Sequence, residues 1–144
     1  MKYTLDIEID QPLEKTIELF DNPENMPKWQ PGLVSFTHRS GTPGEEGAVS
    51  DLIYKMGKRE IAMTETIVKR DLPDEFTGYY EAKGVKNWVK NHFESAGHTK
   101  TRWVSENEFH CKGLMKVMTW IMPGSFRKQS YQYMKDFKTF AESE

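Results

Sequence analysis

The residue of this sequence best suited to chemistry is Glu65. It lies in the segment Arg59–Lys69, where Ile61, Met63 and Ile67 recur at every second position. If this segment is a β-strand, Glu65 shares a face with these apolar residues. A carboxyl group enclosed in this way has a pKa well above its usual value, so it can act as a general acid or base or bind a ligand hydroxyl. In the alternative register the strand turns Glu65 to solvent, the more common location for a carboxylate.

Other segments present faces of the same mixed character. Thr99–Cys111 places Trp103, Asn107 and Phe109 on one face, and Phe76–Lys83 contributes Tyr80. Mainly apolar surfaces with a few polar groups are typical of small-molecule sites. Two methionines of the C-terminal region add flexible apolar side chains. The expected ligand-binding residues are therefore Met63, Glu65, Tyr80, Trp103, Asn107, Phe109, Met118 and Met134.

Metal and phosphate chemistry have no comparable support. The histidines do not form an H-E-x-x-H pattern, and the single Cys111 has no partner for a paired-thiolate site. His110 and Cys111 are adjacent, so on a strand they point to opposite faces and cannot form a Cys–His catalytic pair. The glycine-rich loop "GTPGEEG" lacks the P-loop lysine and the G-x-G-x-x-G spacing. We expect neither a metal nor another cofactor.

Length and composition favour one soluble domain over residues 1–144. The formal net charge is −2, from twenty basic and twenty-two acidic residues, which gives no general attraction to nucleic acid. A lone cysteine fits a reducing compartment. The first residues lack the apolar core of a signal peptide, and no apolar tract approaches the roughly 20 residues of a membrane span. We expect a cytoplasmic protein, whereas its oligomeric state has no sequence signal.

The elements that position these residues follow from periodicity. Residues 3–10 alternate as a half-buried strand, and helical spacing with a proline start signal predicts two short helices before residue 33, with Asp10 or Gln11 as the first cap. Six further strands are expected at Val34–Ser40, Ala48–Met56, Arg59–Arg70, Phe76–Lys83, Trp88–Glu94 and Thr99–Cys111. A short helix over "LMKVMTWIM" and a long amphipathic helix capped by Ser125 complete the chain.

This order predicts an α+β protein in which a curved antiparallel sheet wraps around the long C-terminal helix and leaves a hollow. The segment Asp21–Leu33 carries Trp29 and Met26 among three prolines. We expect these two side chains to pack onto the sheet or the long helix, so that the short helices close one end of the hollow.

Two stretches resemble a known superfamily. "IDQPLEKTIELFDNPENMPKWQPGL" is similar to the opening of START-like (SRPBCC) proteins, which often carry an Asp-Pro-Glu-x-x-Pro-x-Trp segment, here Asn22, Pro23, Glu24, Pro27 and Trp29. The tail "FRKQSYQYMKDFKTFAE" resembles their closing helix. That group includes polyketide cyclases/dehydrases, lipid-transfer domains and birch-pollen-allergen-like proteins. The resemblance implies a helix-grip fold with seven strands, two short helices between strands 1 and 2, and an internal cavity.

Three functions fit these observations. The first is binding or transport of a small hydrophobic molecule such as a lipid, polyketide or isoprenoid-like compound. The second is a cyclase/dehydratase-type enzyme with Glu65 as acid or base, and the third is a co-chaperone-like interaction module. The apolar helix with Met118, Trp120, Ile121 and Met122 is expected to pack on the sheet. If its surface stays exposed, it can serve as a gate, a partner site or a membrane-touching edge.

Overall fold

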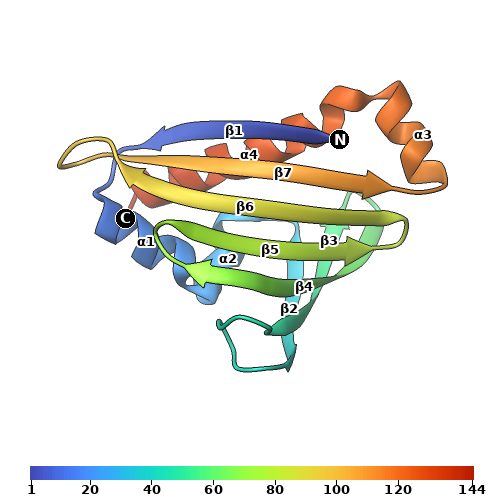
Figure 1. Ribbon diagram of the computed structural model, residues 1–144, viewed down its shortest axis with the longest axis horizontal. Helices are drawn as coiled ribbons and strands as arrows, with labels where there is room; N and C mark the ends of the chain where they lie inside the picture. Colours follow the sequence, from blue (N-terminus) through green and yellow to red (C-terminus); the bar gives the residue numbers. More distant parts are fainter.

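The computed structural model describes residues 1–144, except for the side chain of Pro123 (Figure 1). Its strands are β1 (Lys2–Ile9), β2 (Leu33–Ser40), β3 (Val49–Met56), β4 (Arg59–Asp71), β5 (Glu75–Ala82), β6 (Val85–Ser95) and β7 (Thr101–Cys111). Its helices are α1 (Leu13–Asp21), a 3₁₀ turn η1 (Pro23–Asn25), α2 (Met26–Trp29), α3 (Leu114–Ile121) and α4 (Pro123–Glu142). The α+β class and the seven strands expected from the sequence are confirmed.

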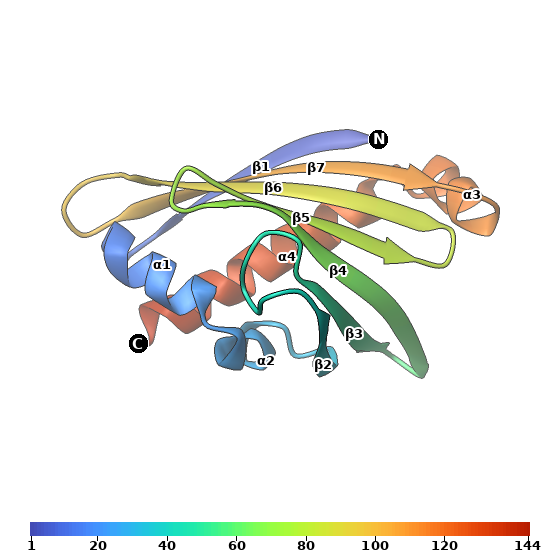
Figure 2. The same cartoon turned by 60° about the horizontal axis from the view of Figure 1, so that its bottom comes forward.

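The strands form one antiparallel sheet in the order β1-β7-β6-β5-β4-β3-β2. The chain crosses the sheet once, between β1 and β2, and α1, η1 and α2 lie in that crossover. Figure 2 shows the sheet curving away at β3 and β2, with α4 passing across its concave side. The helix packs mainly against β1, α2 and α3, so it lies nearer to one part of the sheet than to the rest.

The core under α4 is built from aromatic rings. Phe137 is fully buried, and its ring centroid lies 5.2 Å from that of Trp29 and 5.4 Å from that of Trp103. Leu5, Ile7 and Ile9 of β1, together with Phe93 and Leu19, complete this cluster. Trp29 and Met26 pack inward as expected, Trp29 in this cluster and Met26 against Leu33, Leu52 and Tyr54. The proline-rich segment therefore closes one end of the molecule.

Three boundaries differ from the expectation. The β5–β6 connection is a two-residue turn, because Gly84 adopts a left-handed φ of 77° and β6 begins at Val85. Helix α4 begins at Pro123, a favoured residue type for a first helical turn, and Ser125 lies inside the helix. Neither Asp10 nor Gln11 caps α1, since Pro12 holds the N-cap position and no side chain caps the helix. Instead the Asp10 backbone amide donates to the Glu142 carboxylate, and the Gln11 side chain donates to the Ala141 carbonyl. These two residues tie the ends of the chain together.

The register of β2 also departs from simple alternation. A shift between Leu33 and Ser35 leaves Val34 57% exposed, while Leu33 faces inward opposite Tyr54. Beyond the shift, His38 pairs with Ser50 but stays exposed at the edge of the sheet, where its imidazole Nε2 hydrogen-bonds the Gly41 carbonyl at 2.7 Å. His38 consequently remains outside the interior.

Candidate functional site

The concave face of the sheet contains two separate apolar clusters. One surrounds Phe137 under α4, and the other joins Leu33, Leu52 and Tyr54 at the far strands. The strands between them present side chains that are polar or only half-buried. On the concave side these are Met63, Glu65, Phe76, Tyr80, Ala82, Asn87 and Val89. We use the name central hollow for this set of inward-facing residues of β4, β5 and β6, which lie between the two clusters.

Glu65 lies in the centre of this set. It stands directly opposite Ser50 on β3 and Tyr80 on β5, and only 8% of its surface is exposed. Burial raises the pKa of its carboxyl group, and a hydrogen-bond interaction with Tyr80 partly opposes that rise. The structure thus places Glu65 on the inner face, in the first of the two registers considered.

Tyr80 lies flat along its own strand. A Cβ built on Gly78 would come within 2.9 Å of the Tyr80 Cε2 and 3.1 Å of its hydroxyl. Glycine at position 78 therefore provides the space that the ring occupies. Burial, followed by the neighbouring charge of Glu65, raises the pKa of Tyr80 well above its usual value. The phenol stays protonated and can donate a hydrogen bond.

A second tyrosine, Tyr54 on β3, lies close enough to Glu65 for the two groups to influence each other electrostatically. The Tyr54 hydroxyl donates to the Gln30 side-chain oxygen at 2.6 Å. Burial raises the Tyr54 pKa, with smaller contributions from Tyr133 and Glu65. Tyr54 and Tyr133 also line a pocket of about 330 Å³ between the β3–β4 hairpin and α4. The pocket is open to solvent beside these two rings, and Tyr54 belongs to the same β3 face as Ser50, which pairs with Glu65.

The residues expected to bind a ligand lie in four places. Met63, Glu65 and Tyr80 line the central hollow, and Asn107 lies beside it on β7, where its amide donates to the Ser105 hydroxyl at 3.1 Å. Trp103 and Met134 are packed in the aromatic cluster, with the Trp103 indole donating to Asn91 at 2.9 Å. Phe109 stacks on Tyr3 and contacts Phe126. Met118 lies outside the concave face, because α3 projects from the end of the sheet (Figure 1).

Sequence reasoning missed Ser50, Tyr54 and Asn91. All three are buried polar residues of the concave face. Ser50, Leu52 and Tyr54 occupy every second position of β3 and therefore share one face of the sheet. This period-two pattern can be recognised once β3 is predicted as a strand. Asn91 carried no local signal, since its role is to accept the hydrogen bond of a tryptophan on the neighbouring strand.

The described residues hold no group of three metal-ligating side chains of the His, Cys, Asp or Glu type. Within the same residues, no helix has both the length and the hydropathy of a membrane span.

The geometry can now be compared with known proteins. Residues 1–135 match the family described as polyketide cyclase/dehydrase and lipid transport. The chain belongs to this family. No curated protein matches the sequence, so within the family the likeness rests on the shared pattern and on structure.

Solved structures show how widely this fold is used. The Zhui aromatase/cyclase from Streptomyces sp. R1128 superposes with a TM-score of 0.82 at 10% identity, covering 99% of this chain and 93% of that one. TTHA0849 from Thermus thermophilus gives 0.78 at 12% identity, with 99% and 98% covered. Ara h 8.0201 gives 0.75 at 16% identity, with 100% and 99% covered. At such identities the likeness establishes the helix-grip fold and leaves the ligand open.

Proposed function

We propose that this member of the polyketide cyclase/dehydrase and lipid transport family binds a small hydrophobic molecule in the central hollow. The observation that carries the proposal is the position of Glu65, buried on the concave face between two apolar clusters and next to Tyr80. A carboxyl group in that place has no evident packing role. It fits the few polar groups that orient a ligand in an otherwise apolar site.

The protonation state indicates which ligand atoms suit the site. Burial raises the pKa values of both Glu65 and Tyr80, so it favours the protonated form of each group relative to the same group in water. A carboxylic acid and a phenol are hydrogen-bond donors to an uncharged acceptor. The matching ligand carries a carbonyl, ester or hydroxyl oxygen on an apolar body such as that of a lipid, polyketide or isoprenoid-like compound.

The apolar body would gain its affinity from burial. Met63, Phe76 and Val89 are only half-buried in the free protein. Covering such surface contributes roughly 25 cal/mol per Å². The polar pair sets orientation, and the apolar walls supply most of the affinity.

The first experiment is native mass spectrometry of the freshly purified protein, followed by denaturation and extraction of any bound compound. Thermal unfolding is then measured with a panel of hydrophobic compounds. We expect an additional mass that is lost on denaturation, and a matching compound that raises the Tm. The matched pair Ala82→Leu and Ala62→Leu separates the hollow from the surface. Ala82 faces the hollow, and Ala62 lies exposed on the other face of the neighbouring strand.

Filling the hollow through Ala82→Leu should abolish the Tm shift, while Ala62→Leu should leave it unchanged. Equal shifts in both variants, or no shift with any compound at saturating concentration, would exclude ligand binding in the hollow.

A second candidate is catalysis, favoured by the raised pKa of the Glu65 carboxyl group. In its protonated form, a buried carboxyl group beside a phenol can protonate a carbonyl oxygen and later accept the proton back, as a cyclisation or dehydration requires. If so, Glu65→Gln removes turnover of the bound compound while its Tm shift is retained. Unchanged turnover in this variant would leave binding as the function.

A further inference from the structure

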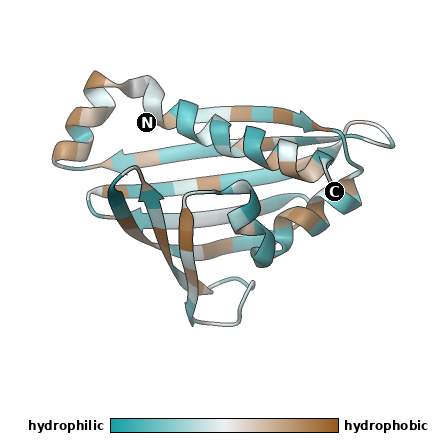
Figure 3. Cartoon of the chain, turned by 180° about the vertical axis from the view of Figure 1, so that it is seen from behind, coloured by the Kyte–Doolittle hydropathy of each residue, from teal (hydrophilic) through white to brown (hydrophobic). Residues whose placement is uncertain are grey.

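The helix α3 (Leu114–Ile121) is apolar and almost unsupported. Only Met115 and Thr119 of this helix are half-buried, and every other residue in it is exposed. Trp120 is 90% exposed, Leu114 75% and Ile121 69%. Figure 3 shows this apolar helix at one end of the molecule, beyond the sheet. So large a contiguous apolar patch on a globular domain marks a surface that contacts something else.

The surroundings of α3 are basic. From Lys112 to Lys135 the sequence contains five basic residues and no acidic one, whereas the rest of the chain has fifteen bases against twenty-two acids. Among the described side chains, none of Lys112, Lys116, Arg127 and Lys128 forms an ion pair. Exposed cations that are not neutralised within the protein are available to an anionic partner.

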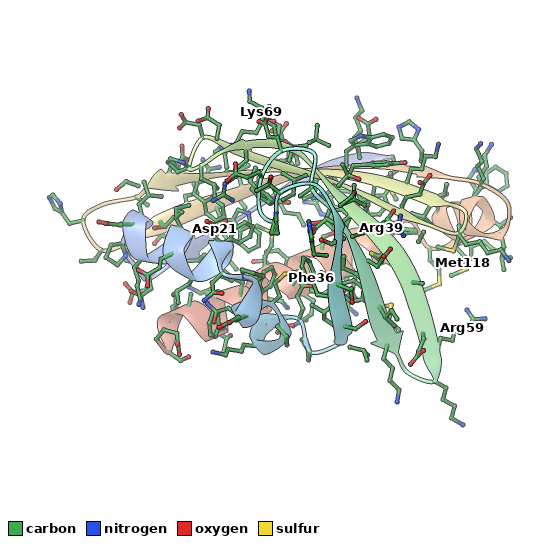
Figure 4. All side chains as sticks on the ribbon, turned by 90° about the horizontal axis from the view of Figure 1, so that it is seen from below. Asp21, Phe36, Arg39, Arg59, Lys69 and Met118 are labelled. Carbon is green, nitrogen blue, oxygen red and sulfur yellow. The ribbon has the colours of Figure 1, made fainter. Side chains whose placement is uncertain are left out.

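Two neighbouring features extend this surface. A pocket of about 330 Å³ at the start of α4 is lined by Leu5, Gly124, Arg127, Lys128 and Tyr131, so it combines two cations with apolar walls. The tip of the β3–β4 hairpin carries Lys58 and Arg59 next to Met56, which is 46% exposed. Figure 4 shows Arg59 and Met118 at the same end of the molecule.

We propose that α3 and the basic residues around it form a docking surface for a bilayer that contains anionic lipid. An exposed tryptophan with aliphatic neighbours suits the boundary between headgroups and acyl chains, and lysines beside it suit the negative surface potential. A helix of eight residues is about 12 Å long. That is too short to supply the roughly 800 Å² per partner of a stable protein dimer, whereas shallow insertion into a bilayer needs no such area.

Docking in this orientation would bring the pocket beside Tyr54 and Tyr133 toward the membrane. The pocket beside Tyr54 and Tyr133 lies between α4 and the β3–β4 hairpin, whose tip lies at the same end as α3. A molecule leaving the bilayer would then reach the pocket without crossing open water. Membrane docking itself does not require that the hollow binds a ligand.

The test is flotation of the full chain with vesicles of phosphatidylcholine, with and without phosphatidylglycerol. We expect binding to the anionic vesicles only, decreasing as salt is raised. Trp120→Glu combined with Ile121→Glu should abolish binding. Lys112→Gln combined with Lys116→Gln should weaken it about 25-fold, from about five-fold per basic residue near an anionic surface.

Matched controls change the same residue types away from α3. Val68→Glu introduces a charge at an exposed apolar position of β4. Lys90→Gln removes an exposed cation from β6. Both variants should bind vesicles as the unmodified chain does. Vesicle binding by the unmodified chain should shift its tryptophan emission to shorter wavelength, as Trp120 enters the bilayer. Trp120→Phe should retain binding without this shift, because the other tryptophans are not on α3.

Several outcomes would overturn the proposal: no binding to anionic vesicles, binding that survives Trp120→Glu with Ile121→Glu, or equal loss in the controls. Self-association would also overturn it, if sedimentation without vesicles shows that the unmodified chain forms oligomers. In that case Trp120→Glu with Ile121→Glu would abolish the oligomers while vesicle binding persists. The helix would then contact a second copy. Ala82→Leu should leave vesicle binding intact, so failure of docking and failure of ligand binding are distinguishable.

Discussion

The ring of Tyr80 lies across the backbone of Gly78, two residues earlier on the same strand. The Tyr80 hydroxyl lies 3.1 Å from the position that a Gly78 Cβ would occupy. Side chains two apart on a strand point to the same face, so any larger residue at 78 would compete with the ring for space. The absence of a side chain at one residue thus decides where the phenol of another lies relative to Glu65.

We predict that Gly78→Ala displaces Tyr80 and impairs the site. The added methyl group would lie 2.9 Å from the Tyr80 Cε2, so the ring or the strand must move, at a cost of about 1–3 kcal/mol. Loss of the interaction with Tyr80, which lowers the Glu65 pKa, should raise that pKa further. Urea unfolding and titration of a ¹³C-labelled Glu65 carboxyl group measure both effects.

When Gly78→Ala is combined with Tyr80→Ala, the tyrosine ring that the added methyl group would contact is absent. The second substitution should therefore remove the strain that the first introduces. If Gly78→Ala costs as much with Tyr80 absent as with Tyr80 present, the contact between the two residues is not the cause.

Glu65 should make stability depend on pH in a specific direction. Below its ordinary pKa of 4.5 the group is protonated in both the folded and the unfolded state. As the pH rises above 4.5, the unfolded chain loses its proton first, because the folded pKa is raised. The free energy of unfolding then falls by about 1.4 kcal/mol per pH unit until the folded pKa is reached.

Glu65→Gln removes this loss. We therefore expect the stability of the variant, relative to the unmodified chain, to increase from pH 4.5 upward and to level off above the folded pKa. Denaturant unfolding across this pH range measures it, and Glu60→Gln at an exposed site of the same strand is the control. A constant difference between variant and unmodified chain would contradict a raised folded pKa.

The ion pair between Asp21 and Arg70 fastens α1 to β4. Two hydrogen bonds of 2.6 Å join the guanidinium to both carboxylate oxygens. The side chains are 34% and 26% exposed, against 42% and 54% for the pair between Asp51 and Arg39. We predict that Asp21→Asn costs about 1 kcal/mol at low salt and that Asp51→Asn costs less, because more exposed pairs are more strongly screened.

Thermal unfolding at two salt concentrations tests this order. Both pairs are bidentate, so equal costs for the two substitutions would show that the lower exposure of the pair at Asp21 adds nothing. Figure 4 shows Asp21 on α1, at the side of the molecule away from α3, so Asp21→Asn should not alter vesicle binding.

The aromatic cluster should tolerate truncation poorly. Phe137 is fully buried and lies within 5.8 Å of the ring centroids of Phe20, Trp29 and Trp103. Phe137→Ala leaves a cavity and should cost about 3–5 kcal/mol. Tyr131→Ala on the same helix removes a ring that is 38% exposed and should cost far less, which urea unfolding of the two variants can establish.

If the two variants unfold at the same urea concentration, the cluster does not determine stability. The core would then depend on other contacts of α4.

The sequence by itself determined the elements and their order. Alternation of apolar residues in β1 and β4, and helical spacing in α4, depend on which side of a segment is buried, and that information is local. The same alternation placed Glu65 on the face of Met63 and Ile67. The match over residues 1–135 fits this order of elements.

Other features depended on residues that meet only in the folded chain. A register shift in β2 exposed Val34, although local alternation gave no sign of it. The glycine at position 78 acquired meaning only when the ring of Tyr80 was found above it. Local pattern cannot supply these facts, because they depend on strand register and side-chain direction.

The largest difference between what the sequence predicts and what the structure shows concerns α3. Its composition predicts burial, and the sequence places it beside the helix that the sheet surrounds. Only the tertiary structure leaves it beyond the end of β7, with Trp120 in solvent. The helix follows β7 past the end of the sheet and precedes the turn into α4, so only Met115 and Thr119 within it are half-buried and the rest of its apolar surface meets solvent.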